Sequence, residues 1–227
     1  MPCYKLDGEL WFPPVEAAEE YGLLAVGGDL SPERLLLAYS LGIFPWYNPG
    51  EPVLWWSPDP RCVLFSTNLH ISRSLKRFMR NQTYRISFNE NFPGVIYWCR
   101  RLRAGSDGSG TWITPEIKNA YTHLHQLGFA HSVECWDGDQ LVGGLYGICI
   151  GRCFFGESMF SRSKNASKVV LVHLMDHLHE KGFALLDCQQ TTDHLVSMGA
   201  GEISRKEFQQ HLQEASVPPY GPFVSQF

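Results

Sequence analysis

The segment AHSVECWDGDQLVGGLYGICIGRCFFGESMF, residues 130–160, decides the fold of this chain. β-Branched, aromatic and cysteine side chains fill its three apolar runs, a composition that favours strands. Asp137-Gly138 is a typical two-residue hairpin turn between the first two runs, and Gly151 provides the second turn. The segment therefore predicts a three-stranded antiparallel meander over residues 130–136, 141–150 and 152–160.

One helix and one further strand are expected directly after the meander. Asn165 is placed to cap a helix that runs to Lys181, Gly182 is placed to end it, and a strand follows over residues 183–188. Three strands, a crossover helix and a strand make a mixed sheet whose last strand lies parallel to the strand 152–160. The fold class is therefore α+β, with a mixed sheet flanked by helices. Acyl transfer to amines often uses such a sheet, although a fold alone does not establish a function.

The remaining chain divides into a short irregular part and a regular part. Residues 1–60 are rich in Pro, Gly and Trp, and we expect one helix there, over residues 31–41, with turns elsewhere. A small domain at residues 1–60 and a larger one at 61–227 are therefore expected. Within the larger domain, we expect strands at 61–65 and 84–88 and helices at 72–80, 92–102, 115–126, 192–198 and 204–214.

Two carboxylates each end an apolar run. Glu157 follows residues 153–156, CFFG, and Asp187 follows residues 183–186, FALL. Burying an unpaired carboxylate costs on the order of several kcal/mol, so each acid is either paired for structure or retained for chemistry. The predicted strand pairing brings the two acids near one another. Gln189 has the same parity as Asp187, so both side chains should face one way if the strand continues that far.

Each of these residues has two possible roles. Asp187 beside Gln189 is suited to deprotonating an attacking amine and to stabilising an oxyanion, or the two form a structural pair that caps the next helix. Glu157 is suited to a cationic substrate, or it forms an internal salt bridge with Arg162 or Lys168. The spacing alone leaves both alternatives open.

Several kinds of site and location are not supported by the sequence. The seven cysteines are scattered without a CxxC pair, which argues against a disulfide framework and against a zinc ribbon. His173 and His177 lie on a polar helix face, and no metal site is expected. The turn 161–166 has no glycine to cradle a pyrophosphate, which counts against coenzyme A. The apolar stretches are too short to span a membrane and the N-terminus does not resemble a signal peptide, so we expect a cytoplasmic protein without a membrane partner.

A basic stripe lies on the predicted helix 72–80. The chain carries 19 Lys and Arg against 23 Asp and Glu, a net charge of −4, yet residues 61–89 contain six basic residues and no acid. Four of the six fall at i, i+3, i+4 and i+7, on one side of the helix. This stripe is suited to binding phosphates, the alternative being an ordinary solvated charged face. Its members are Arg73, Lys76, Arg77 and Arg80.

Several long motifs occur in the order found in one known family. The chain resembles the bacterial leucyl/phenylalanyl-tRNA–protein transferases over about residues 20–210. The motifs that carry the resemblance are GLLAVGGDLS at 22–31, GIFPW at 42–46, WWSPDPR at 55–61, GTWI at 110–113, AHSVE at 130–134, LVGGLYG at 141–147, GESMFS at 156–161, NASK at 165–168 and DCQ at 187–189.

The resemblance implies a reaction and an architecture. Leucine or phenylalanine, and by tolerance methionine, would move from its tRNA ester to the α-amine of a protein that begins with Arg or Lys, creating a degradation signal. The family has a small N-terminal domain and an acetyltransferase-like C-terminal domain, and it uses neither a metal nor coenzyme A. An acyl-CoA N-acyltransferase of small amines and a non-catalytic tRNA-binding module remain as alternatives.

The resemblance also implies roles for particular residues. Asp187 and Gln189 would act as a catalytic pair on the α-amine, with Glu157 as an acid of the substrate site. The basic stripe would hold the acceptor stem of the tRNA. The pocket for the transferred side chain and the terminal adenine would be lined by Trp46, Trp112, Leu145, Phe154, Met159, Leu174 and Leu178.

Overall fold

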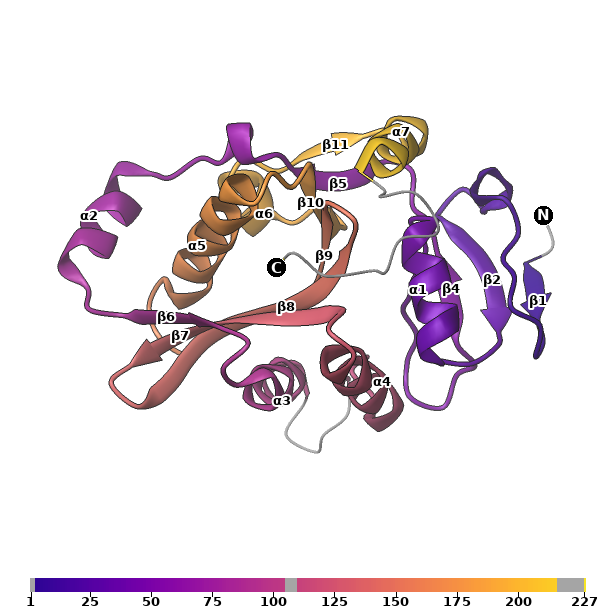
Figure 1. Cartoon of the computed structure of the whole chain (residues 1–227), viewed down its shortest axis with the longest axis horizontal. Coiled ribbons are helices and arrows are strands. Elements are labelled where there is room, and N and C mark those ends of the chain that lie inside the picture. The colour runs from indigo at the N-terminus through magenta and orange to yellow at the C-terminus, as the bar shows by residue number, and fades with distance from the viewer. Residues whose placement is uncertain (1–2, 105–109, 216–226) are drawn as a thin grey trace.

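Among the residues that the structure describes, the strands form two β-sheets, one of four strands and one of seven (Figure 1). The computed structural model describes residues 3–104, 110–215 and 227. Every strand of the smaller sheet comes from residues 4–56, and every strand of the larger sheet comes from residues 61–203. The division predicted near residue 60 falls between these two sets of strands.

The smaller sheet contradicts one expectation. Residues 1–60 were expected to form turns outside one helix, but four short strands pair there in the order β1-β2-β4-β3. The prolines keep each strand to five residues or fewer without preventing the pairing. The expected helix is present, capped by Ser31, whose hydroxyl accepts from the Arg34 amide. The elements are β1 (Tyr4–Leu6), β2 (Leu23–Gly27), α1 (Pro32–Ser40), β3 (Phe44–Pro45) and β4 (Leu54–Trp56).

The larger sheet confirms the predicted centre of the fold. Its order is β11-β5-β10-β9-β8-β7-β6, in which β7, β8 and β9 form the antiparallel meander. β10 lies parallel to β9, with Asp187 opposite Phe155, as the crossover rule predicted. β11 was not predicted, because three residues are too few to show a period. The strands are β5 (Arg61–Leu64), β6 (Arg85–Phe88), β7 (Ala130–Asp137), β8 (Gln140–Ile150), β9 (Cys153–Ser161), β10 (Leu185–Gln189) and β11 (Gly201–Ile203).

Helices cover both faces of the larger sheet. On β8, Leu145 faces the core beneath α5, whereas the next residue, Tyr146, faces the core beneath α3 and α4. This alternation buries both faces and explains why β8 is apolar along almost its whole length. The helices of the larger domain are α2 (Arg73–Asn81), α3 (Phe92–Arg103), α4 (Pro115–Gln126), α5 (Ala166–Glu180), α6 (Asp193–Ser197) and α7 (Arg205–Ala215).

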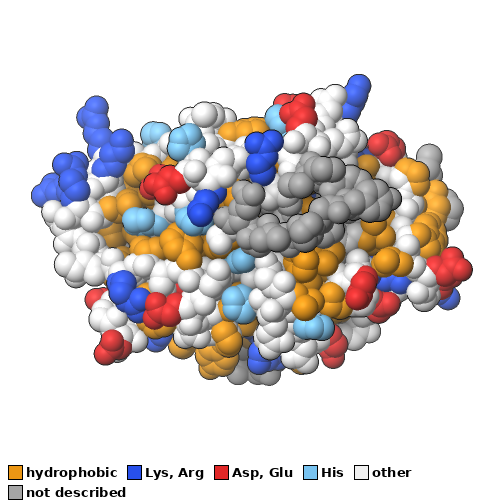
Figure 2. Space-filling model, in the orientation of Figure 1, with side chains coloured by type: hydrophobic (Ala, Val, Ile, Leu, Met, Phe, Trp, Pro, Cys, Tyr) orange, Lys and Arg blue, Asp and Glu red, His pale blue; other side chains and the backbone are white. Residues whose placement is uncertain are grey.

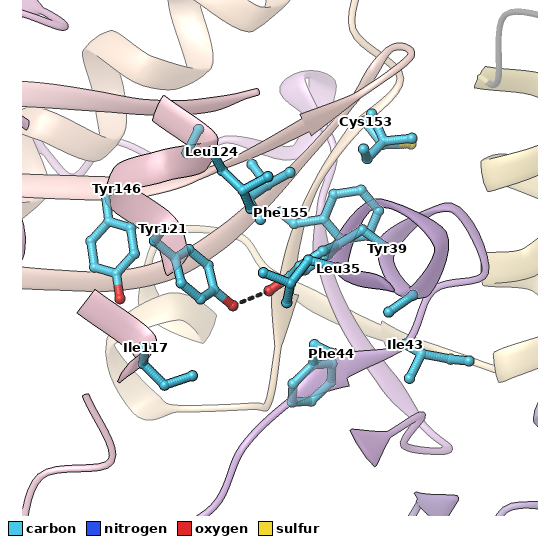
Figure 3. Packing of buried hydrophobic residues seen from close by; sticks show 14 of the residues in the cluster. Leu35, Tyr39, Ile43, Phe44, Ile117, Tyr121, Leu124, Tyr146, Cys153 and Phe155 are labelled. Atoms are coloured by element: carbon cyan, nitrogen blue, oxygen red, sulfur yellow. Dashed lines mark hydrogen bonds between the residues drawn. The ribbon is translucent and has the colours of Figure 1, made fainter. Parts of the chain in front are cut away.

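The core beneath α3 and α4 continues into the segment that carries the smaller sheet. Tyr39 of α1 packs edge-on against Phe155 of β9, with ring centroids 5.2 Å apart. Figure 3 shows Tyr39 meeting Tyr121 of α4 in the same cluster. Trp55 and Leu24 of the small sheet belong to this cluster as well. The two sheets are thus separate, but one apolar core joins them and fixes α1 against the end of β9.

None of the helices in the described residues is both long enough and apolar enough to cross a membrane.

Candidate active site

A cavity of about 440 Å³ lies where β3 and the residue after it meet β9 and β10. Most of its described wall comes from residues 44–46, residues 156–159 of β9 and residues 186–190 at the end of β10. The cavity thus gathers the three segments in which sequence analysis placed reactive and apolar site residues. Seven of the predicted site residues line it: Trp46, Trp112, Leu145, Glu157, Met159, Asp187 and Gln189.

Three predicted pocket residues lie elsewhere. Phe154, Leu174 and Leu178 are almost fully buried in the core between α5 and the sheet, and they do not line the cavity. In the structure they pack behind the wall that Leu145 and Met159 form. Direct contact between these three side chains and a donor stays a prediction.

Glu157 is held by neutral hydrogen-bond donors. The Tyr39 hydroxyl donates to Oε1 over 2.7 Å, the Tyr121 hydroxyl donates to Oε2 over 3.0 Å, and the Gln189 carboxamide Nε2 donates to Oε1 over 2.8 Å. The described residues form no salt bridge with Glu157, and Arg162 instead lies over the Trp98 ring, 3.8 Å from its centroid. The internal salt bridge considered for Glu157 is therefore not what stabilises it.

The surroundings of Glu157 set its protonation. Only 8% of the residue is exposed. The pKa of Glu157 is raised to about 7, chiefly by burial, with the Asp187 charge adding to the rise and the three donors opposing it. Burial also raises the pKa of Tyr39 and of Tyr121 well above the usual range, so both phenols remain protonated donors. Glu157 is thus poised to gain or lose a proton near neutral pH.

Asp187 has a different environment. It is fully buried and makes a two-pronged pair with Arg61, with Nε–Oδ1 at 2.8 Å and Nη2–Oδ2 at 2.7 Å. The Arg61 guanidinium lies between the rings of Phe44 and Phe208, 4.8 and 4.7 Å from their centroids. The backbone N–H of Gln189 donates to Asp187 Oδ1 over 2.9 Å. Asp187 is therefore neutralised and held by the protein itself.

A β-bulge separates the directions of Asp187 and Gln189. Opposite β5, Asp187 pairs with Val63 and Gln189 with Cys62, so Cys188 is the extra residue. Gln189 has a left-handed backbone conformation, with φ of 63°. The expectation that the two side chains face one way assumed regular alternation, and the bulge breaks it. Asp187 reaches Arg61, whereas Gln189 reaches Glu157.

A second bulge lies beside the first. Gly156 pairs with Gly147 of β8 and Ser158 pairs with Tyr146, which leaves Glu157 as the extra residue of β9. Bulges re-aim side chains, and they are common next to active sites. The two irregular points on neighbouring strands together place Glu157 and Gln189 at one wall of the cavity.

Three residues of this site could not be identified from the sequence. Tyr39 and Tyr121 sit on the buried faces of α1 and α4, and no motif in the sequence singles them out. Arg61 is one of the six basic residues of the segment 61–89, but it pairs with a residue 126 positions away. No local pattern reports such contacts.

The basic stripe lies away from this cavity. Arg73, Lys76, Arg77 and Arg80 are exposed on α2, together with Asn81 around a shallow depression. Figure 2 shows Lys and Arg side chains gathered at the end of the molecule that α2 occupies in Figure 1. The stripe therefore forms one continuous surface, outside the site that contains Glu157.

The described residues offer no prepared metal site. No group of three or more His, Cys, Asp or Glu side chains among them is arranged to hold an ion. In the turn between β9 and α5, polar groups bond to one another: the Ser161 hydroxyl donates to the Ser163 carbonyl over 2.8 Å.

Comparison with known proteins gives full-length matches. A family model described as leucyl/phenylalanyl-tRNA protein transferase matches residues 63–213, and the model of its N-terminal domain matches residues 28–59. A protein of Syntrophotalea carbinolica is 55% identical over 230 residues, 99% of this chain and 100% of its own length. A protein of Syntrophobacter fumaroxidans is 58% identical over 214 residues, 94% of this chain and 91% of its own. Both relatives are named leucyl/phenylalanyl-tRNA–protein transferase.

Two solved structures that match are much more distant. A ribosomal-protein-alanine N-acetyltransferase from Brucella melitensis is 14% identical, with a TM-score of 0.37 over 64% of this chain and 99% of that one. L-PGS from Bacillus licheniformis is 10% identical, with a TM-score of 0.43 over 85% of this chain and 63% of that one. The family assignment therefore rests on the sequence matches.

Proposed function

Because the chain belongs to the leucyl/phenylalanyl-tRNA–protein transferase family, we propose that the cavity beside Glu157 is where the aminoacyl group changes carriers. Membership makes the chain an aminoacyltransferase, with aminoacyl-tRNA as donor and a protein as acceptor. The acceptors we propose are proteins that begin with Arg or Lys, and the product is a degradation signal. We place the reaction in the cytoplasm, where aminoacyl-tRNA is made and used.

The reaction does not require the protein to form a covalent bond with either substrate. The α-amine of the acceptor attacks the ester carbonyl, the C–N bond forms, and the ribose oxygen leaves with a proton. The amine must be neutral to attack, and it must lose one proton as the amide forms. Since the ester is already activated, positioning and weak base catalysis are sufficient.

Glu157 is the proposed proton acceptor. The observation that carries this proposal is a cavity-lining carboxylate with a pKa near 7, surrounded by neutral donors rather than cations. Such a group attracts an ammonium and accepts its proton near neutral pH. Gln189 lies against Glu157 and faces the same cavity, so we assign its carboxamide to orienting the reactants.

Asp187 is the proposed positioning residue. Arg61 occupies both carboxylate oxygens, and the Gln189 amide uses one of them as well. An acid neutralised in this way is poorly placed to take a proton from an amine. Asp187 instead fixes the bulge that aims Gln189, which replaces the direct base role that the resemblance suggested.

The donor is proposed to bind by two surfaces. Trp46, Trp112, Leu145 and Met159 give the cavity an apolar wall that suits leucine, phenylalanine and, by shape, methionine, as well as the adenine ring. The stripe on α2 would hold the acceptor stem through its phosphates, contacts that position nucleic acid without reading its sequence.

A transfer assay tests the proposal. The purified protein is mixed with leucyl-tRNA labelled on leucine and with peptides that begin with Arg, Lys or Ala. We expect label in the Arg and Lys peptides, little in the Ala peptide, and a rate at least about 100-fold lower for Glu157→Gln. Full activity of Glu157→Gln would remove Glu157 as proton acceptor. Transfer from leucyl-coenzyme A instead of leucyl-tRNA would restore the acyl-CoA alternative.

A further inference from the structure

Arg103 is the cation of the cavity that the proposed chemistry leaves unused. Of the described residues that line the cavity, it is the single Lys or Arg. It is the last residue of α3, and its Nε donates to the Ser158 hydroxyl over 3.1 Å. Ser158 directly follows Glu157 on β9 and is 6% exposed. A positive group is thus tied to the backbone that carries the proposed proton acceptor.

We propose that Arg103 binds the phosphate on the 5′ carbon of the donor's terminal nucleotide. This assignment rests on the proposed function of the cavity. The aminoacyl ester and that phosphate are attached to the same ribose, only a few bonds apart, so a cavity that holds one has the other at its mouth. Arginine is well suited to this contact, because its planar guanidinium can make paired, charge-assisted hydrogen bonds to phosphate oxygens.

The position of Arg103 favours the donor over the acceptor as its partner. Acidic side chains vary in number and place from one acceptor protein to another, whereas the terminal phosphate is present in every tRNA. A fixed cation matches the constant group. The hydrogen bond through Nε to Ser158 orients the guanidinium without using its two terminal nitrogens, which form the edge that pairs with phosphate.

The contact would hold the ester of the donor at a fixed position relative to Glu157. Apolar walls such as Trp46 and Trp112 bind a side chain or a base without strong directionality. A phosphate anchored at Arg103, next to Ser158, limits how far the ribose can slide past Glu157. Arg103 would therefore set the placement of the ester, while the stripe on α2 contributes binding at a distance.

Two matched inhibitors test this inference. Both are adenosines that carry leucine at the 3′ position through a stable amide, one with a 5′-phosphate and one without. Each competes with leucyl-tRNA in the transfer assay, and its inhibition constant is measured for the wild-type protein and for variants. We expect the phosphorylated compound to bind more tightly to the wild-type protein. Arg103→Ala should weaken its binding about tenfold and leave the unphosphorylated compound unchanged.

Two further variants separate charge from structure. Arg103→Gln keeps a polar side chain of similar reach but loses the charge, so it should also lose the preference for the phosphate. Arg101→Ala removes an exposed arginine of the same helix that does not line the cavity, and it should keep the wild-type ratio. Thermal unfolding of each variant shows whether the fold is intact.

Three outcomes would overturn the inference. In the first, the wild-type protein binds both compounds equally, and in the second, Arg103→Ala weakens the binding of both by the same factor. Either result would assign Arg103 a structural role beside Ser158. If Arg103→Ala raised KM only for acceptor peptides that contain acidic residues, Arg103 would be assigned to binding the acceptor. Loss of transfer from leucyl-tRNA by the wild-type protein would instead contradict the proposed function, so the two failures are distinguishable.

Discussion

The Asp187 carboxylate accepts a hydrogen bond from the backbone N–H of Gln189, while the Gln189 side chain bonds to a different acid. The Gln189 N–H donates to Asp187 Oδ1 over 2.9 Å, and the Gln189 carboxamide donates to Glu157 Oε1 over 2.8 Å. Asp187 itself is paired with Arg61. A buried ion pair is thereby linked, through one residue, to a carboxylate that lines the cavity. The division of labour between the two acids follows from this link.

Removing Arg61 should cost more stability than removing any surface ion-pair partner. Arg61→Ala leaves the Asp187 carboxylate buried without its partner, and we expect the free energy of unfolding to fall by about 3–5 kcal/mol. Urea unfolding measures the change. The control is Arg85→Ala, which breaks the exposed pair with Glu90 and should have little effect. Equal decreases in the two variants would contradict a structural role for the Arg61–Asp187 pair.

The transfer rate should rise with pH through a midpoint near 7. Glu157 accepts a proton only when ionised, and its pKa is about 7, so the profile should contain a limb with its midpoint near 7, distinct from the limb of the acceptor α-amine at about 8. A pH–rate profile with leucyl-tRNA and an Arg peptide measures the midpoint. Glu157→Gln should lose this limb of the profile, and a limb that persists in the variant would belong to another group.

Stability should change with pH in the opposite direction. The folded pKa of Glu157 lies above the unfolded value near 4.3, so the folded protein holds a proton that the unfolded chain has released. The contribution of Glu157 is fully present below about pH 4.3 and is lost as pH rises to about 7. We therefore expect Glu157→Gln to gain stability relative to wild type between about pH 5 and about pH 8. Unfolding titrations at several pH values measure this, and an unchanged difference would contradict the raised pKa.

The two tyrosines should tune the same midpoint. Tyr39→Phe and Tyr121→Phe each remove a hydrogen bond that favours the ionised carboxylate, so each should shift the pH–rate midpoint upward. Tyr146→Phe is the matched control, since the buried Tyr146 hydroxyl has no hydrogen-bond partner among the described residues. A midpoint that moves equally in all three variants would show that the effect does not come from bonding to Glu157.

The stripe on α2 should control salt dependence without affecting chemistry. Changing Arg73, Lys76, Arg77 and Arg80 to Ala should raise KM for leucyl-tRNA. The slope of log KM against log salt should fall by about 1 for each phosphate that the variant no longer binds. The rate at saturating tRNA should be unchanged. Lys181→Ala, an exposed lysine after α5, serves as control. An unaltered salt slope in the fourfold variant would show that tRNA binds elsewhere.

The fold could be predicted where local pattern and global pairing agree. The meander of β7, β8 and β9 and the parallel placement of β10 follow from apolar runs, turn residues and the handedness of the crossover. The small N-terminal sheet could not be predicted in the same way, since its strands have two to five residues and are separated by prolines. Strands that short show no period.

The candidate site was predictable in its residues but not in its connections. Glu157, Asp187 and Gln189 were recognisable as polar groups at the ends of apolar runs. Which acid is neutralised depends on Arg61, and which one meets tyrosines depends on α1 and α4, so neither could be read from spacing. The pocket shows the same limit: Phe154, Leu174 and Leu178 have the expected chemistry but pack behind the cavity wall.

The two bulges have a consequence for how this sheet can change over evolution. Deleting Glu157 would let Gly156 and Ser158 pair in sequence with Gly147 and Tyr146, and deleting Cys188 would do the same for β10 against β5. Either deletion would produce a more regular ladder with the flanking apolar faces preserved, and would remove or misdirect the reactive group. The site thus depends on two extra residues, one in each of two neighbouring strands. Mutations that made the sheet more regular and more stable would remove these residues unless selection for activity retained them.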